Sequence, residues 1–244
     1  MARVLGESGR YVSEQSTQKL LRMVLLVYVF GCVISAFSGY ALGAKQLYIS
    51  IFVIVFIPIA FIYMKKKFIA LEKERLNYRK GAIGEALVGL TLETFPDEYR
   101  VIHDLTTPYG NIDHVVVGPS GVYVIDTKNW RGVVTSDGNS GLMVNGKPTD
   151  KPETKNLTRM IMSIKDKVKV LCDMDPYVQG VLAFPSAHVD AKWGTTGAVH
   201  CMTDEKLYDY IVENKRGQNL SKAQIDSVSH AFLALARMDK GFET

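Results

Sequence analysis

Two short apolar runs joined by a tight turn decide the fold: residues 111–128 read NIDHVVVGPSGVYVIDTK. Valine and isoleucine dominate both runs, and the Gly-Pro-Ser-Gly segment between them is typical of a β-hairpin turn. If Val117 pairs with Val122, the two positions of every cross-strand pair add up to 239, and Asp113 lies opposite Asp126. Both faces of this hairpin carry apolar side chains, so we expect both to be buried.

The charged residues of the hairpin gather at one end of one face. Opposed side chains of an antiparallel pair have Cβ atoms about 4.5–5.5 Å apart, a separation at which two carboxylates repel each other. Lys128 lies two residues beyond Asp126, so strand alternation places it on the same face. Because both faces are expected to be buried, charges at the rim indicate a site rather than a solvated surface.

A divalent cation between Asp113 and Asp126 would remove their repulsion. Two carboxylates with room for water suit Mg²⁺ or Mn²⁺ better than zinc. Such a cation stabilises charge on a phosphate group and lowers the pKa of a bound water, while Lys128 would orient that water or help to deprotonate it. The pattern therefore predicts hydrolysis of a phosphodiester.

The elements around the hairpin predict an α/β fold with a mixed sheet. Apolar residues at helical spacing predict helices over 82–95, ended by Pro96, and over 157–171. Short apolar runs predict further strands at 99–103 and 178–184. After the second helix and strand, we expect an edge strand at 198–202, a helix at 205–213, and a final helix through Met238 that begins with a capping box of Ser221 and Gln224. The glycine-rich and polar residues 136–150 are expected to form an exposed loop.

Three motifs in this order resemble the nuclease-related domain (NERD) family, a branch of the PD-(D/E)xK nuclease superfamily. They are Gly81-Ala82-Ile83-Gly84-Glu85, Ile112-Asp113-His114 and Ile125-Asp126-Thr127-Lys128-Asn129. The likeness covers about residues 79–169. It implies a restriction-endonuclease-like mixed sheet core (αβββαβ), and the C-terminal helices predicted above lie outside the likeness.

The resemblance also implies a role for each residue of the site. Glu85, Asp113 and Asp126 would surround a Mg²⁺ or Mn²⁺ ion, the carbonyl of Thr127 would be a further ligand, and Lys128 would be the lysine of the motif. The chain departs from the family at Asp126, where glutamate is common, and at 151–156, where a Pro-x-x-Gln feature is not clear.

The residues that follow the hairpin are candidates for contact with nucleic acid. Asn129, Trp130 and Arg131 could meet a phosphate or stack on a base, although simple packing explains Trp130 equally well. His114 alternates away from Asp113, so we interpret it as a packing or hydrogen-bonding residue. Glu85 taken alone could also be an ordinary exposed acid of a helix.

The N-terminal quarter of the chain predicts a transmembrane helical hairpin. Residues 23–41 and 47–64 lack formal charges, and each is long enough to cross a bilayer core of about 30 Å as a helix. Basic residues flank the outer ends of the two spans, whereas the connection at 42–46 holds a lone Lys45. The positive-inside bias therefore places both termini in the cytoplasm of a bacterial-type inner (cytoplasmic) membrane.

Other interpretations of the apolar segments are weaker. A cleaved signal peptide has a shorter apolar region and no second span. Neither span contains an acid or a base, which disfavours a channel or pump. Three cysteines among 244 residues are too few for a disulfide scaffold. The predicted organisation is a cytoplasmic tail (1–22), the membrane hairpin (23–64), a helical stalk (65–78), the nuclease-like domain (79–190) and a C-terminal α/β extension packed on it (191–244).

The sequence thus predicts a membrane-anchored, Mg²⁺-dependent nuclease that acts on the cytoplasmic face. DNA is favoured over RNA as the substrate, although no residue visibly reads a 2′-hydroxyl. Residues 68–244 carry 21 basic and 23 acidic side chains, a balance that argues against a strongly basic binding surface. The alternative is a catalytically inactive, membrane-tethered scaffold that binds nucleic acid or protein. The oligomeric state is left open.

Overall fold

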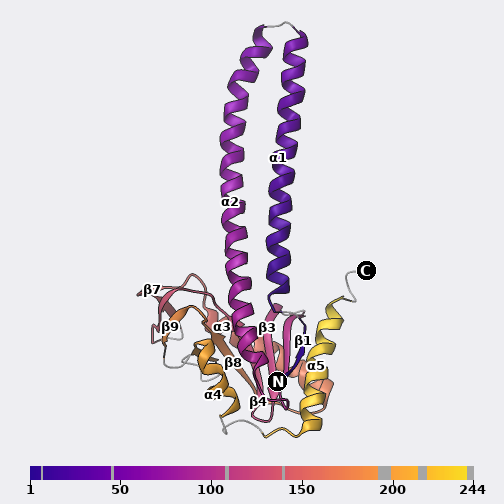
Figure 1. Ribbon diagram of the computed structural model, residues 1–244, viewed down its shortest axis with the longest axis vertical. Coiled ribbons are helices and arrows are strands. Elements are labelled where there is room, and N and C mark those ends of the chain that lie inside the picture. The colour runs from indigo at the N-terminus through magenta and orange to yellow at the C-terminus, as the bar shows by residue number, and fades with distance from the viewer. Residues whose placement is uncertain are drawn as a thin grey trace. The chain divides into compact units, whose positions relative to one another are not determined.

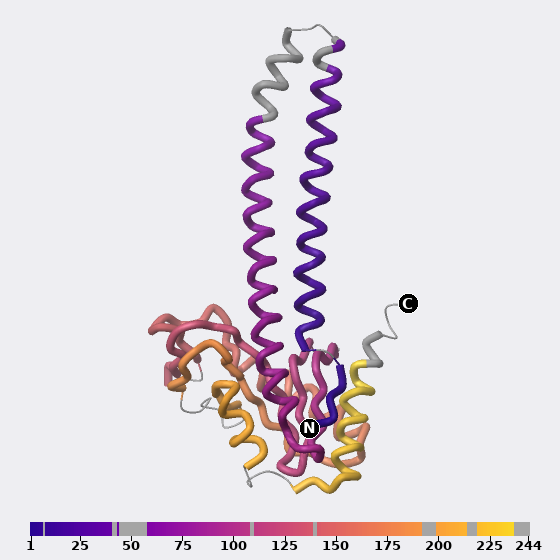
Figure 2. The backbone as a smooth tube through the Cα atoms, viewed as in Figure 1, coloured from indigo at the N-terminus to yellow at the C-terminus, as the bar shows by residue number. Residues whose placement is uncertain are grey.

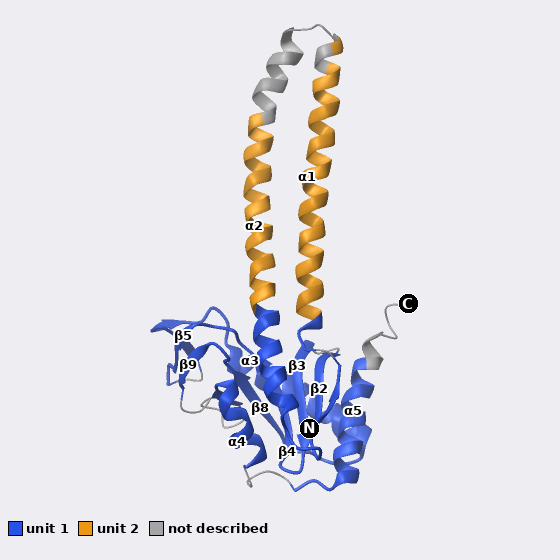
Figure 3. Cartoon of the chain, in the orientation of Figure 1, with its two compact units in different colours: residues 1–10, 81–244 blue, residues 11–80 orange. Residues whose placement is uncertain are grey.

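The structure is a computed structural model that describes residues 1–6, 8–44, 47–107, 110–138, 141–191, 199–213 and 219–240, and the remaining residues are grey in Figure 2. Within these ranges, the side chains at 41–42, 44, 47–57 and 237–240 are not described. The chain divides into two compact units, one formed by residues 1–10 and 81–244 and the other by residues 11–80 (Figure 3). The units are described separately below.

A six-stranded mixed sheet forms the centre of the first unit (Figure 1). Its strands, in spatial order, are β1 (Arg3–Leu5), β2 (Arg100–Thr107), β3 (Gly110–Gly118), β4 (Gly121–Thr127), β8 (Val178–Ala183) and β10 (Val199–Met202). The strands β2, β3 and β4 are antiparallel neighbours, whereas β1, β8 and β10 join by parallel pairing. The predicted mixed α/β sheet is therefore confirmed.

The hairpin of β3 and β4 has the predicted register. Val117 pairs with Val122, and the ladder continues to His114 opposite Ile125. Both faces are buried, as expected, because helices cover each of them. Helices α3 (Glu153–Cys172) and α5 (Lys222–Lys240) pack on one face, and the end of α2 (Leu47–Glu93) and α4 (Leu207–Val212), which follows the short 3-10 turn η1 (Asp204–Lys206), pack on the other.

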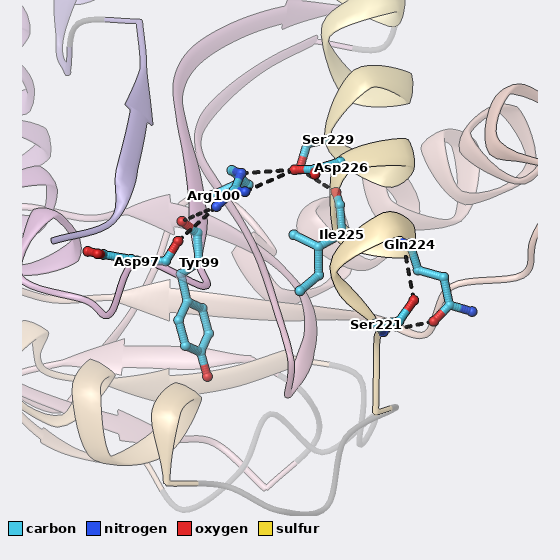
Figure 4. A network of polar contacts seen from close by, with 8 residues as sticks. All are labelled: Asp97, Tyr99, Arg100, Ser221, Gln224, Ile225, Asp226 and Ser229. Carbon is cyan, nitrogen blue, oxygen red and sulfur yellow. Dashed lines mark hydrogen bonds and ion pairs between the residues drawn. The ribbon is translucent and has the colours of Figure 1, made fainter.

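Polar contacts at the start of α5 attach this helix to the sheet (Figure 4). The predicted capping box is present, because Gln224 Oε1 accepts a hydrogen bond from the Ser221 N–H at 2.8 Å and Ser221 Oγ accepts one from the Gln224 N–H at 3.4 Å. The guanidinium of Arg100 on β2 lies 3.0 Å from Asp226 on α5 and donates to the Asp97 carbonyl at 2.9 Å.

A second, four-stranded sheet replaces the loop predicted at 136–150. It consists of β7 (Lys147–Pro148), β6 (Leu142–Val144), β5 (Gly132–Ser136) and β9 (Ala187–Asp190), in this order. Strands β5 and β9 pair in parallel a few residues after β4 and β8, which are also parallel neighbours. Val134 and Leu142 are buried, so this segment packs through apolar side chains of its own. Its many glycine and polar residues favoured the prediction of a loop, which is wrong here.

The N-terminal segment, predicted as a tail over residues 1–22, contributes a strand instead. Arg3, Val4 and Leu5 pair in parallel with residues 100–102 at the edge of the large sheet. Three residues are too few for an alternation pattern, and their partner lies almost a hundred positions away, so the sequence carried no local signal for β1.

The second unit consists of α1 (Arg10–Ala44) and the larger part of α2. Helix α2 is continuous through Pro58, through the predicted stalk at 65–78 and through the separate helix predicted at 82–95. Among the described residues, one stretch, Arg10–Tyr40, is long and apolar enough to cross a membrane. The second predicted span, 47–64, falls largely outside the residues with described side chains, so the two-helix anchor is not shown and stays a prediction.

Candidate active site

Lys128 stands between two carboxylates just beyond the end of β4. Its Nζ atom lies 2.8 Å from Asp126 Oδ2 and 3.5 Å from Oε2 of Glu153, the first residue of α3. The Lys128 N–H donates to the Ala183 carbonyl at 2.8 Å, which extends the pairing of β4 with β8 by one residue. Burial alone would lower the pKa of Lys128, but the charges of Asp126 and Glu153 outweigh it and raise this pKa. The ammonium therefore stays protonated and favours orienting a water over deprotonating it.

Asp113 approaches the same point from β3. Its Oδ2 atom accepts a hydrogen bond from the Thr127 N–H at 2.7 Å, one residue beyond Asp126. Burial raises the pKa of Asp113 well above its usual value, and the charges of Asp126 and Glu85 raise it further. The structure thus brings together the two aspartates that the hairpin register predicted to face each other.

Glu85 is a buried acid of α2, which excludes the interpretation as an exposed helix residue. It is 5% exposed, and its Oε2 atom has no hydrogen-bond partner among the described residues. Burial, followed by the charges of Asp104 and Asp126, raises the pKa of Glu85 from 4.5 to about 7. The Ser8 hydroxyl donates to the Glu85 carbonyl at 2.7 Å, which ties this turn of α2 to the N-terminal segment.

The close approach of α2 to the end of β4 depends on Gly84. A Cβ atom at this position would lie 2.6 Å from Asn129 Cβ and 3.0 Å from Asn129 Cγ. These distances are far shorter than ordinary contacts, so only glycine allows the helix to lie this near to Asn129. The Gly84-Glu85 pair in the first motif therefore has a physical reason: the glycine gives the approach that carries the acid into the site.

Asp104 is an acid of the site that the sequence patterns did not indicate. Strands β2 and β3 keep one register along their whole length, but the pair that Asp104 would form with Asp113 is missing from the ladder. Asp104 has a left-handed φ of 53° there, and Ile102 and Leu105 consequently face the same apolar cluster. Its Oδ1 atom accepts a hydrogen bond from Asn111 Nδ2 at 3.1 Å. Alternation could not reveal Asp104, because the alternation breaks at this residue.

A pair of buried histidines lies next to these acids along the chain. His103 Nδ1 and His114 Nδ1 are 2.7 Å apart, and the two rings meet edge to face. Burial lowers the pKa of His103 to about 4, and burial together with His103 lowers the pKa of His114 well below its usual value. Both rings are therefore neutral near pH 7, and the contact of His114 with His103 agrees with the expected packing and hydrogen-bonding role.

The predicted nucleic-acid contacts have different surroundings. Trp130 is partly buried against Phe184, with ring centroids 5.4 Å apart, which favours the packing interpretation. Asn129 packs on Gly84, and Arg131 is exposed. Thr127 has a buried Oγ1 atom without a hydrogen-bond partner among the described residues. Its carbonyl as a metal ligand and Arg131 as a phosphate contact stay predictions.

The donor set fits a hard divalent cation with few protein ligands. The residues that the structure describes contain no group of three His, Cys, Asp or Glu side chains arranged to hold a metal ion. Mg²⁺ commonly keeps several waters and needs one or two carboxylates. Asp113 and Asp126 supply two carboxylates. The buried Oε2 atom of Glu85 has no hydrogen-bond partner among the described residues, and a cation or a water bound to it would be such a partner.

Comparison with known proteins finds a similarity that covers the residues of the site. Residues 80–185 match the model of the family described as NERD, nuclease-related domain. An uncharacterized protein of Bacillus anthracis is 41% identical over 66 residues, which cover 25% of this chain. The chain spans 31% of the length of that relative, and no solved structure matches. The whole candidate site, including Asp104 and Glu153, lies within the residues that match the nuclease-related domain.

Proposed function

We propose that the protein is a Mg²⁺-dependent nuclease that hydrolyses phosphodiester bonds of DNA. The observation that carries this proposal is the convergence of Asp113 and Asp126, with buried Glu85, beside the ammonium of Lys128. A divalent cation would relieve the repulsion between the carboxylates. This cation and the protonated Lys128 would both attract a phosphate group. The match of residues 80–185 to a nuclease-related domain supports the same reaction class.

The residues of the site would divide the work as follows. Asp113 and Asp126 would hold the cation, with the Thr127 carbonyl and Glu85 as further donors. When bound, this cation would lower the pKa of a water and neutralise charge on the phosphate. Lys128 would bind a phosphate oxygen or orient the attacking water as a fixed cation, and Glu153 would keep the ammonium in place.

The N-terminal helices are proposed to anchor this domain at the cytoplasmic face of a bacterial-type inner membrane. The stretch Arg10–Tyr40 supports an anchor by its length and composition. Lys65, Lys66 and Lys67 follow the second apolar segment, and the positive-inside bias would keep them in the cytoplasm.

The test uses the full chain, because a fragment beginning at residue 68 would lack β1. Purified protein is incubated with plasmid DNA, single-stranded DNA and RNA in Mg²⁺ or Mn²⁺. We expect Asp126→Asn and Lys128→Met to slow DNA cleavage about 100-fold or more. Asp166→Asn and Lys167→Met, which change exposed residues of α3, are the matched controls and should retain activity. Equal activity in all four variants would refute the site.

The ion pair of Lys128 with Asp126 and Glu153 favours a second candidate, a catalytically inactive scaffold. In that case the lysine itself balances the acids, and no metal is needed. Calorimetric titration with Mn²⁺ separates the two functions: a nuclease should release or absorb heat that Asp126→Asn abolishes, whereas a scaffold should give no heat and no cleavage.

A further inference from the structure

A groove between α1 and α2 lies entirely within the second unit, and neither the nuclease site nor the anchor accounts for it. Its volume is about 670 Å³, within the range of about 300–1,000 Å³ that is usual for small-molecule sites. Leucine, valine and other apolar side chains of both helices line it, and two basic residues, Arg22 and Lys67, belong to the lining as well.

The two helices run antiparallel along the groove, so its charged residues fall at one end. Lys19 on α1 forms an ion pair with Glu74 on α2. Further along both helices come Leu71 and then Arg22 and Lys67, and beyond them the lining is apolar, apart from the Tyr63 hydroxyl, as far as Val33 and Ala60. The groove therefore has a cationic end and an apolar body.

The apolar body is open. Leu25 and Val29, both in the lining, are 61% and 50% exposed. Arg22 and Lys67 are exposed too, and no ion pair involves either of them within the part of the chain that the structure describes. A helix rises about 16 Å between Arg22 and Val33, close to half of the roughly 30 Å hydrocarbon core of a bilayer.

We propose that this groove binds one anionic phospholipid of the cytoplasmic leaflet. An acyl chain would fill the apolar body, and the phosphate would contact Arg22 and Lys67. The dimensions favour a lipid over a helix of another chain, because the apolar body is about as long as one leaflet is thick and two cations lie near one end of it. Basic pockets between membrane helices on the cytoplasmic side bind anionic headgroups in this way. The inference rests on the proposed membrane anchor and is independent of the nuclease chemistry.

The experiment must separate a defined site from general attraction to a negative surface. The full chain is purified in neutral detergent, and binding of phosphatidylglycerol or phosphatidylcholine is followed by native mass spectrometry. The variant Arg22→Gln/Lys67→Gln removes the two cations of the groove. The charge-matched control Lys65→Gln/Lys66→Gln removes two neighbouring cations that do not line it. The variant Val29→Trp fills the groove without changing charge.

We expect one tightly held phosphatidylglycerol per chain. Arg22→Gln/Lys67→Gln should weaken its binding about tenfold or more relative to the control, because hydrogen bonds between charged groups are the strong ones. Val29→Trp should weaken the binding of both lipids, because the acyl chain loses its place. Equal losses in the two double variants, or unchanged binding in Val29→Trp, would overturn the proposal.

A failure of the anchor would look different. In that case the wild-type chain would not remain with phosphatidylcholine vesicles on flotation, whatever the headgroup preference. Wild-type chain that floats with such vesicles yet shows no preference for phosphatidylglycerol would overturn the lipid site alone. DNA cleavage enters neither readout.

Discussion

Replacing Gly84 by alanine tests whether the approach of α2 places Glu85 in the active site. The new Cβ atom would lie 2.6 Å from Asn129 Cβ, whereas ordinary contacts begin near 3.4 Å. The atom in the way is bonded to the Asn129 backbone, so a side-chain rotation cannot remove the clash. The helix or the segment after β4 must therefore move by a sizeable part of an ångström.

The displacement should affect catalysis more than stability. Overpacking costs about 1–3 kcal/mol, but alanine is better than glycine in a helix by about 1 kcal/mol, so the net loss of stability is about 0–2 kcal/mol. A displacement approaching 1 Å at a catalytic group can slow a reaction about 100-fold, equivalent to about 2.7 kcal/mol of barrier. We expect Gly84→Ala to lose about this much cleavage rate, while its free energy of unfolding falls by no more than about 2 kcal/mol.

A second substitution makes this reasoning refutable. Asn129→Ala keeps the obstructing Cβ atom and should not restore activity to Gly84→Ala. Asn129→Gly removes that atom and should restore part of it, and single Asn129 variants provide the baselines. Plasmid cleavage by the full chain and Mn²⁺ affinity by calorimetry measure the outcome. Wild-type activity in Gly84→Ala, or equal behaviour of the two double variants, would contradict the structural argument.

Three further predictions concern charge. The folded-state pKa of Glu85, about 7, lies above its ordinary value of 4.5, so the folded chain retains a proton that the unfolded chain loses. The free energy of unfolding in metal-free buffer should therefore fall as pH rises through this interval, and Glu85→Gln should flatten the slope in urea titrations; an unchanged slope would contradict the burial of this acid. Lys128→Met should destabilise the fold by about 1–3 kcal/mol, because it leaves the carboxylate of Asp126 without its cation. The same substitution should destabilise the fold less in an Asp126→Asn background, where that carboxylate is absent. Purely additive effects of the two substitutions would exclude an energetic coupling between Lys128 and Asp126. Arg100→Met should lower the free energy of unfolding by about 1–3 kcal/mol, because Asp226 and the Asp97 carbonyl lose their partner (Figure 4). Asp226→Asn should lower it less, because the Asp226 side chain is 44% exposed. Urea denaturation of both variants tests this order.

Local patterns in the sequence were enough for the hairpin and for the helices that cover it. The pairing of Val117 with Val122 across the turn predicts the register as far as His114, and helical spacing predicts the buried side of α3. Both signals depend on neighbours in sequence, where the period is visible. The same register predicts that Asp113 and Asp126 lie close together, and the structure places both at the Thr127 and Lys128 end of β4.

The elements that escaped prediction depend on contacts distant in the chain or on a break in periodicity. Strand β1 exists because its residues pair with β2, and the second sheet because β5 and β9 meet. Glu153 reaches Lys128 only because α3 begins beside the end of β4. Asp104 has a left-handed φ, and the residues on either side of it, Ile102 and Leu105, face the same apolar cluster, so strand alternation fails at this point.

The balance of charge in the site bears on the choice between enzyme and scaffold. The charges of Asp104 and Asp126 raise the pKa of Glu85, and the charges of Asp126 and Glu85 raise the pKa of Asp113, in each case in addition to burial. Lys128 is a single cation, already shared between Asp126 and Glu153. The repulsion between the acids that Lys128 does not neutralise destabilises the fold. A scaffold would have no use for these acids, and asparagine or glutamine in their place would remove the repulsion. Protons relieve the repulsion at low pH, and a divalent cation would relieve it near pH 7. Metal affinity should therefore rise with pH through the range in which Glu85 loses its proton, and calorimetric Mn²⁺ affinity that stays constant across that range would remove this reason for preferring the enzyme.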